Sequence, residues 1–209
     1  MRRRLPGDDI RKMSRSICVL MFLALTSAAA AKNLLIEKIP PSGACFFRRY
    51  DEAHLREHPG QTTVSVRISL RRELPFTPED ARDLRIEFRQ KGHAKPFYVV
   101  GGCAWSEEAN RDIRGARLIQ SFRKDAAAQC MARGGLGGSA EEGGDFPIDL
   151  AEDGASVTLY MDEGVSGWRG PDQKKKSTYL ELTRQNRVFR LERVDPAACV
   201  ELDKSVAVD

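Results

Sequence analysis

The chain has 209 residues, of which 34 are lysine or arginine and 30 are aspartate or glutamate, so its formal net charge is +4 at pH 7. Six of the basic and two of the acidic residues lie in 1–31, which leaves 28 of each in the rest of the chain. The basic balance therefore belongs to the N-terminal segment, and it gives no reason to expect nucleic-acid binding.

The N-terminal segment has the three parts of a secretory signal peptide. A basic stretch is followed by the apolar run 17–25, and small residues continue up to Ala31. The run is shorter than the ~20 residues that a membrane-spanning helix needs. Met13 is an alternative start, because the sequence from that residue on is already a complete signal. We predict a signal peptide over 1–31, a periplasmic or secreted protein, and no transmembrane segment in the mature chain.

Alternation of apolar and polar residues is the strongest local signal in 32–209, which has the length of a single domain. In 63–71 every even position is apolar and every odd position is polar. A period of two predicts a strand with one buried and one wet face, as found in antiparallel sheets. Further strands are predicted at 84–89, 97–100, 146–150, 156–161, 179–184 and 187–193, with a weak candidate around Cys130.

Turns and short helices connect these strands. Residues 152–155 predict a hairpin, and Gln185-Asn186 predicts a tight hairpin between the last two strands. Residues 51–57 predict two helical turns before a proline. In 77–82 a threonine N-cap and a proline at the first helical position predict a connecting helix. The expected fold is an all-β single antiparallel domain of about eight strands, either a small soluble barrel or a sandwich, with one or two short helices.

Four cysteines follow the signal peptide, and an even number in an exported chain predicts two disulfides. No two of the four form a C-x-x-C pair of the kind that zinc sites use. Residues 84–103, which end in Cys103, are similar to residues 179–199, which end in Cys199. The longer segments 45–103 and 130–199 are therefore candidates for a pseudo-duplication. The duplication would pair Cys45 with Cys103 and Cys130 with Cys199. The rival pairing is Cys103–Cys130 with Cys45–Cys199, and we slightly favour it because Cys103 and Cys130 flank one loop.

His54, Glu57 and His58 match the H-x-x-E-H pattern of the inverted zinc proteases. In those enzymes both histidines lie on one helical face, and the glutamate acts as general base on metal-bound water. Pro59 disfavours helical angles at His58, so we expect this residue at or beyond the helix end, with its ring off the face of His54. The resembled family also has a large helical catalytic domain, whereas this chain is mostly strand. We interpret the match as accidental, with a zinc or copper site on His54 and His58 as the alternative.

No other motif predicts catalysis or a cofactor. The nucleophile pattern G-x-S-x-G does not occur, and the glycine run 134–138 lacks the ending of a phosphate loop. A tryptophan at a loop edge packs in a core or lines a binding mouth, and a lysine run is solvated or contacts an anionic surface. The candidate ligand or partner surface is made of Trp105, Trp168, Lys174, Lys175 and Lys176.

Two segments resemble parts of short, uncharacterised exported proteins of Gram-negative bacteria. They are CFFRRYDEAHLREHPGQTTVSVRISL and NRVFRLERVDPAAC. The resemblance implies export and no particular activity.

Three classes of function remain. The first, which we favour, is a non-enzymatic binding protein of the periplasm for a small ligand or a protein. The second is an inhibitor of an exported hydrolase, because small disulfide-bonded periplasmic barrels such as the C-type lysozyme inhibitors are analogues at the level of the fold. The third is a metal-binding protein or zinc hydrolase that uses His54, Glu57 and His58. The first class would use the barrel mouth or an exposed sheet, and a dry barrel interior would argue against it.

Overall fold

The structure is a computed structural model that describes residues 33–72, 78–105, 127–135, 143–161, 164–173 and 176–207. These residues belong to one compact unit, 31–209. The predicted signal peptide lies outside the described residues.

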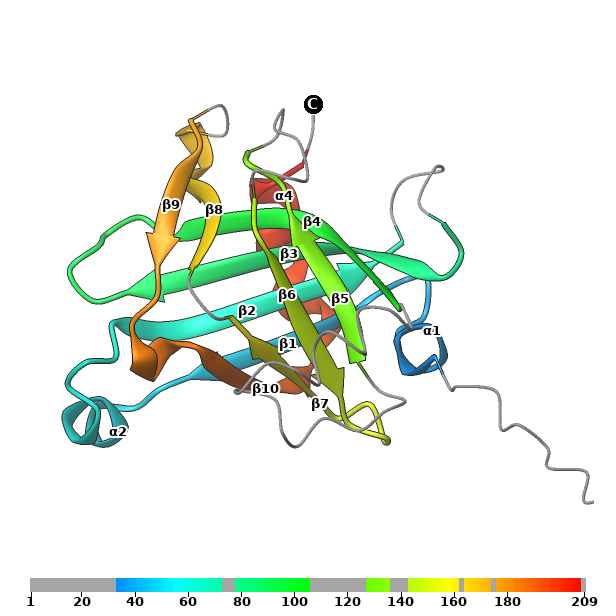
Figure 1. Ribbon diagram of the computed structural model, residues 1–209, viewed down its shortest axis with the longest axis horizontal. Helices are drawn as coiled ribbons and strands as arrows, with labels where there is room; N and C mark the ends of the chain where they lie inside the picture. The colour runs from blue at the N-terminus through cyan, green and yellow to red at the C-terminus, as the bar shows by residue number, and fades with distance from the viewer. Residues whose placement is uncertain are drawn as a thin grey trace, which may run out of the picture. The chain divides into compact units, whose positions relative to one another are not determined.

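Strands are the main secondary structure of the described chain (Figure 1). They are β1 (Ala44–Arg49), β2 (Thr63–Arg71), β3 (Ala81–Gln90), β4 (Phe97–Trp105), β5 (Ala127–Ala132), β6 (Asp145–Leu150), β7 (Ser156–Tyr160), β8 (Gly164–Arg169), β9 (Thr178–Glu181) and β10 (Val188–Val194). The helices are α1 (Leu34–Lys38), α2 (Glu52–Glu57) and α4 (Val200–Ser205), and the 3-10 turns are η2 (Pro171–Gln173), η3 (Arg184–Asn186) and η4 (Pro196–Cys199).

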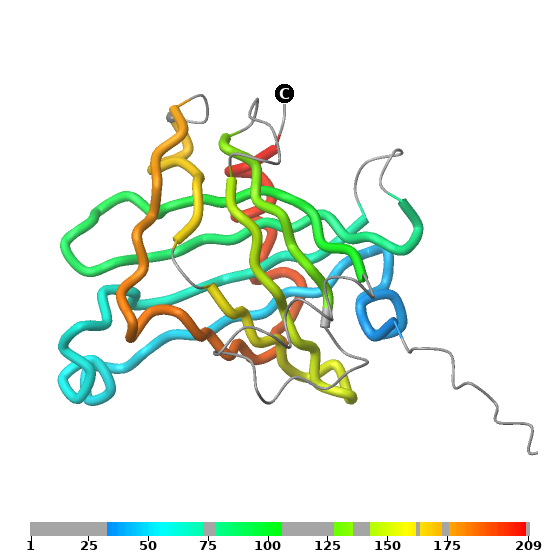
Figure 2. The backbone as a smooth tube through the Cα atoms, in the orientation of Figure 1, coloured from blue at the N-terminus to red at the C-terminus, as the bar shows by residue number. Residues whose placement is uncertain are grey.

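Eight of the strands form a closed antiparallel barrel. Their order is β3-β2-β1-β10-β7-β6-β5-β4, and pairing of β3 with β4 closes the ring. Consecutive strands β1 to β7 are neighbours, and β10 returns between β7 and β1 (Figure 2). Of the two predicted alternatives, a barrel and a sandwich, the fold is therefore a barrel. Closure leaves none of its eight strands as a free edge.

Strands β8 and β9 are additional to the barrel. Strand β8 pairs with Phe97 and Tyr98 at the start of β4, and β9 pairs with β8. The tight hairpin predicted at Gln185-Asn186 is wrong, because β9 and β10 are not partners. The 3-10 turn η3 separates them, and β10 pairs with β7 and β1 instead.

Apolar side chains fill the inside of the barrel. The inward residues of β2, Val66, Ile68 and Leu70, are at most 1% exposed. They belong to one core cluster with five phenylalanines, each at most 2% exposed: Phe46, Phe88, Phe97, Phe146 and Phe189. An eight-stranded barrel is just wide enough for side chains to fill it, and full burial of each phenylalanine stabilises the fold by about 1.5–3 kcal/mol.

Helix α1 and Arg82 lie together beside the start of β3. Arg82 is 2% exposed, and its Nε and Nη2 atoms donate to the carbonyl oxygen of Ile39, the residue that follows α1, at 2.9 and 2.6 Å. Burial lowers the pKa of Arg82, and the charge of Arg72 lowers it further. The helix predicted over 77–82 is wrong, since β3 begins at Ala81. Pairing with β4 and these two hydrogen bonds outweigh the local helix-start signal.

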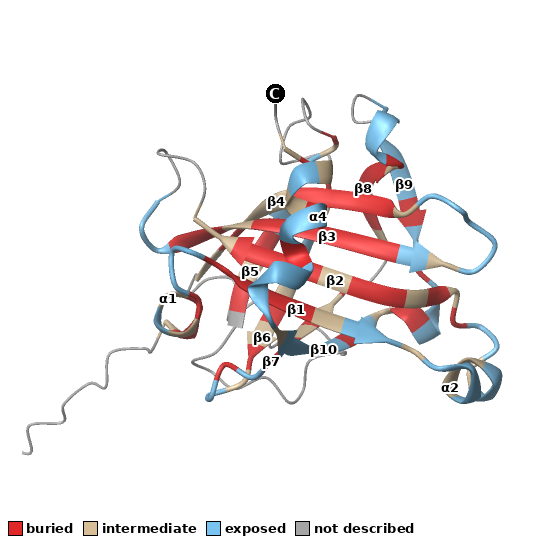
Figure 3. Ribbon diagram, turned by 180° about the vertical axis from the view of Figure 1, so that it is seen from behind, coloured by how far each residue is buried: buried red, intermediate tan, exposed pale blue. Residues whose placement is uncertain are grey.

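The C-terminal segment covers part of the outer wall of the barrel. Figure 3 shows α4 lying across the strands of this wall, and η4 and α4 contact β1, β2 and β3. Leu202 of α4 and Val206, the C-cap of this helix, join a second core cluster with Tyr98, Val100 and Trp168.

Two disulfides hold the fold. Cys45 of β1 is bonded to Cys199 of η4, and Cys103 of β4 is bonded to Cys130, its direct partner on β5. The favoured of the two predicted pairings is therefore confirmed, and the pairing implied by a duplication is not found. Two disulfides indicate an oxidising compartment outside the cytoplasm. In the part of the chain that the structure describes, none of the helices combines the length and the apolar character needed to cross a bilayer.

Candidate functional site

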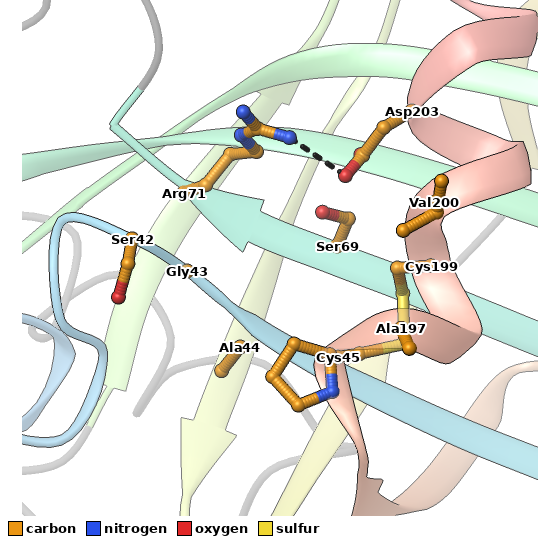
Figure 4. Close-up of a pocket in the computed structure, with 11 residues that line it drawn as sticks. Ser42, Gly43, Ala44, Cys45, Ser69, Arg71, Ala197, Cys199, Val200 and Asp203 are labelled. Carbon is orange, nitrogen blue, oxygen red and sulfur yellow. Dashed lines mark hydrogen bonds and ion pairs between the residues drawn. A yellow bond between two sulfur atoms is a disulfide. The ribbon is translucent and has the colours of Figure 1, made fainter.

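A groove of about 210 Å³ lies on the outer wall, between strands β1 and β2 and the C-terminal segment (Figure 4). One side is apolar and consists of Ala44, Ala197, Val200 and the Cys45–Cys199 disulfide. The other side is polar and carries Ser42, Ser69, Arg71 and Asp203. The groove therefore offers an apolar wall and a charged wall to the same bound group.

Ion pairs order the polar side of the groove. Arg71 Nη1 lies 2.8 Å from Asp203 Oδ2, and Arg85 Nη1 lies 3.0 Å from Asp203 Oδ1. The arginines come from the outer faces of β2 and β3, and the carboxylate comes from α4. Burial lowers the pKa of Arg85, the hydrogen bond and charge of Asp203 oppose this, and the charge of Arg71 adds to it.

Arg71 is the charged group that the groove presents most openly to solvent. Its side chain is 33% exposed, against 17% for Asp203 and 9% for Arg85. Asp83 is the cross-strand partner of Arg71 in the β2–β3 register, but it does not line the groove. A bound group therefore meets more exposed positive than negative charge.

The neighbouring hydroxyls lie on the floor and the rim of the groove. Ser69 is 3% exposed, and Figure 4 shows it between Arg71 and the disulfide. Ser42 is exposed in the turn before β1. Gly43, with φ 102°, lets the chain enter β1 close to Arg71, because a β-carbon at Gly43 would lie 2.9 Å from the β-carbon of Arg71.

The histidines predicted as metal ligands lie at the end of α2, away from the groove. As predicted, the helix ends before His58, which is its C-cap. The expectation that the ring of His58 lies off the face of His54 is wrong, because the ring centroids are 4.4 Å apart. Glu57 is exposed. Within the described ranges no group of three or more histidine, cysteine, aspartate or glutamate residues could hold a metal ion.

The predicted partner surface is scattered in the structure. Trp168 is fully buried and packs against Tyr98, with the ring centroids 6.1 Å apart, so it is a core residue. Trp105 is half-buried at the end of β4, and Lys176 is exposed before β9. Lys174 and Lys175 lie outside the described residues.

Sequence reasoning missed every polar residue of the groove. Ser69 and Arg71 occupy the wet positions of the best-predicted strand, where they looked like ordinary solvent-facing residues. Asp203 lies in a C-terminal stretch without a predicted element. The one available signal was Cys199, since a disulfide to Cys45 brings the C-terminal segment onto β1.

The chain was also compared with protein-family models, with curated proteins and with solved structures, and no match was found.

Proposed function

We propose that the chain is an exported, non-enzymatic binding protein whose outer groove receives an acidic group of a protein partner. The proposal rests on one observation, the difference between the two places where a barrel can bind a partner: its interior and its outer wall. The interior is occupied by packed phenylalanine and aliphatic side chains, whereas the wall carries an open groove with a partly exposed arginine.

The size of the groove favours a protein over a small molecule. Sites that enclose whole small ligands commonly measure about 300–1,000 Å³. A groove of about 210 Å³ has room for one or two side chains, or for a chain end, while the rest of the partner stays outside.

The chemistry of the groove favours a carboxylate. A guanidinium group binds a carboxylate with two parallel hydrogen bonds, and such charge-assisted bonds are roughly twice as strong as neutral ones. Arg71 is fixed by its ion pair with Asp203, so less side-chain entropy is lost when a second carboxylate binds. Ser69 adds a hydroxyl donor on the floor, and Val200 and Ala197 fit the aliphatic part of a residue.

Export is supported by the predicted signal peptide and by the two disulfides. The test is expression of the full chain in a Gram-negative host, followed by fractionation and N-terminal sequencing. The expected product is periplasmic and begins near residue 32. A chain retained in the cytoplasm with its first residues intact would contradict export.

The groove is tested with acetyl-dialanine as a carboxylate probe and with its C-terminal amide as the matched control. Both are titrated into the ¹⁵N-labelled, disulfide-bonded protein. We expect the carboxylate to shift the amide resonances of Gly43, Ser69 and Ala197, and the amide to leave them in place. Equal shifts from both probes, or none with the carboxylate, would rule out this site.

A further inference from the structure

Two imidazole rings lie in contact at the end of α2, on a part of the chain that the groove does not use. His54 is in the last turn of the helix, and His58 follows it by four residues, the spacing that places side chains on the same helical face. Their ring centroids are 4.4 Å apart with an interplanar angle of 41°. Tyr50 stacks against His54 at 4.9 Å, so the position of the His54 ring is fixed.

Gln61 determines which nitrogen of His54 carries the proton. Gln61 is 4% exposed, and its Nε2 atom donates to the carbonyl oxygen of Thr63 at 3.1 Å. Its Oε1 atom therefore faces Nε2 of His54, also at 3.1 Å. An amide oxygen only accepts hydrogen bonds, so Nε2 of His54 is the donor, and in the neutral ring Nδ1 then holds the lone pair.

Gln61 also fixes His58. Its backbone N–H donates to the carbonyl oxygen of His58 at 2.9 Å, and the N–H of His58 donates to the carbonyl oxygen of His54 at 3.0 Å. One buried residue thus holds the ring of the first histidine and the backbone of the second. A hydrogen bond from the far ring nitrogen to a fixed oxygen is the usual outer contact of a metal-binding histidine.

We propose that His54 and His58 bind one late first-row divalent transition-metal ion. His54 binds through Nδ1, and His58 binds through a ring nitrogen. Imidazole nitrogen is a preferred ligand of copper, nickel and zinc, and Cu²⁺ binds most tightly in this series. Two protein ligands leave the other coordination positions to water. The site is therefore a surface metal site and not the active site of an inverted zinc protease, whose third protein ligand has no counterpart among the described residues.

The test is titration of the disulfide-bonded protein with Cu²⁺, followed by calorimetry and electron paramagnetic resonance. We expect one Cu²⁺ per chain and hyperfine coupling to two imidazole nitrogens. His54→Ala and His58→Ala are each expected to weaken binding at least tenfold. His93→Ala is the matched control, since His93 is exposed in the β3–β4 turn, and it is expected to bind Cu²⁺ like the unchanged protein.

Gln61→Met tests the outer contact without removing a ligand, and a 10- to 100-fold loss of affinity is expected. Circular dichroism of each metal-free variant shows whether it is folded. The proposal is overturned if the His54→Ala/His58→Ala double variant keeps full affinity. It is equally overturned if the electron paramagnetic resonance spectrum of the unchanged protein reports fewer than two imidazole nitrogens. This second test depends on no substitution.

Discussion

Arg85 of β3 and Asp203 of α4 form an ion pair 3.0 Å long, although 118 residues of chain separate them. The Arg85 side chain is 9% exposed and that of Asp203 is 17% exposed, so the pair is shielded from solvent. A six-residue helix such as α4 is too short to be stable alone. This pair and the Cys45–Cys199 disulfide therefore fix the helix to the barrel and form one side of the groove.

Removing the carboxylate of this pair should loosen the helix. Asp203→Ala removes the carboxylate that pairs with the nearly buried Arg85, and we expect the free energy of unfolding to fall by about 2–4 kcal/mol. Urea denaturation with intact disulfides measures the change. Glu201→Ala on the same helix is the control, because Glu201 and its partner Lys204 are both exposed, so we expect a change below about 0.5 kcal/mol. Equal losses in both variants would contradict the role of Asp203.

The two disulfides should differ in their effect on stability. The Cys45–Cys199 bridge spans 154 residues and the Cys103–Cys130 bridge spans 27. Loop-closure entropy predicts losses of about 5 kcal/mol for the first and about 3.5 kcal/mol for the second when both cysteines are replaced by alanine. Urea denaturation of the two double variants compares them. A larger loss for the short bridge would mean that chain entropy does not dominate.

Adjacent glycines of β4 should respond differently to alanine. A β-carbon at Gly101 would overlap the carbonyl group of Met131 on β5, whereas at Gly102 the nearest atom is 3.8 Å away. We expect Gly101→Ala to destabilise the protein by about 1–3 kcal/mol through overpacking. Gly102→Ala is expected to be neutral or to stabilise by up to about 1 kcal/mol, because it restricts the unfolded chain. Thermal unfolding measures the stability of both variants. A larger loss of stability for Gly102→Ala than for Gly101→Ala would contradict this prediction.

Asp172 should titrate below its ordinary range. Lys95 Nζ donates to both carboxylate oxygens of Asp172, at 3.0 and 2.9 Å, and this hydrogen bonding lowers the pKa of Asp172 from 3.8. A lowered carboxyl pKa stabilises the fold above about pH 3.8 and ceases to do so as the pH falls further. Carboxyl ¹³C shifts in Lys95→Met should show the pKa of Asp172 rising. Lys204→Met, which affects another ion pair, should leave it unchanged.

Period-two patterns predicted the strands that have one buried and one wet face. Strand β2 was predicted over its full length, 63–71. Strand β1 was missed because Cys45 and Phe46, adjacent in sequence, are both buried, one under the C-terminal segment and one in the barrel. Strand β8 was missed because GVSGWR contains two glycines and has little intrinsic strand preference.

The C-terminal helix and the groove could not be predicted from local sequence. Helix α4 has no side-chain N-cap hydrogen bond, and it is held by its contact with β3 and by the Arg85–Asp203 ion pair. The groove combines residues near 42–45, 69–71 and 196–203, which no motif spans.

The contact between the rings of His54 and His58 was also missed. The rule that proline shortens the helix was correct, but it does not determine where the side chain at the helix end points.

The proposed site depends most directly on Arg71 as the group that binds a carboxylate, and its neighbour Arg72 provides a matched comparison. Their side chains are 33% and 34% exposed, but only Arg71 lines the groove. The decisive measurement is the acetyl-dialanine titration repeated on folded Arg71→Met and Arg72→Met. We predict at least tenfold weaker binding for Arg71→Met and unchanged binding for Arg72→Met. Undiminished binding by Arg71→Met, or an equal loss in both variants, would contradict the proposed site.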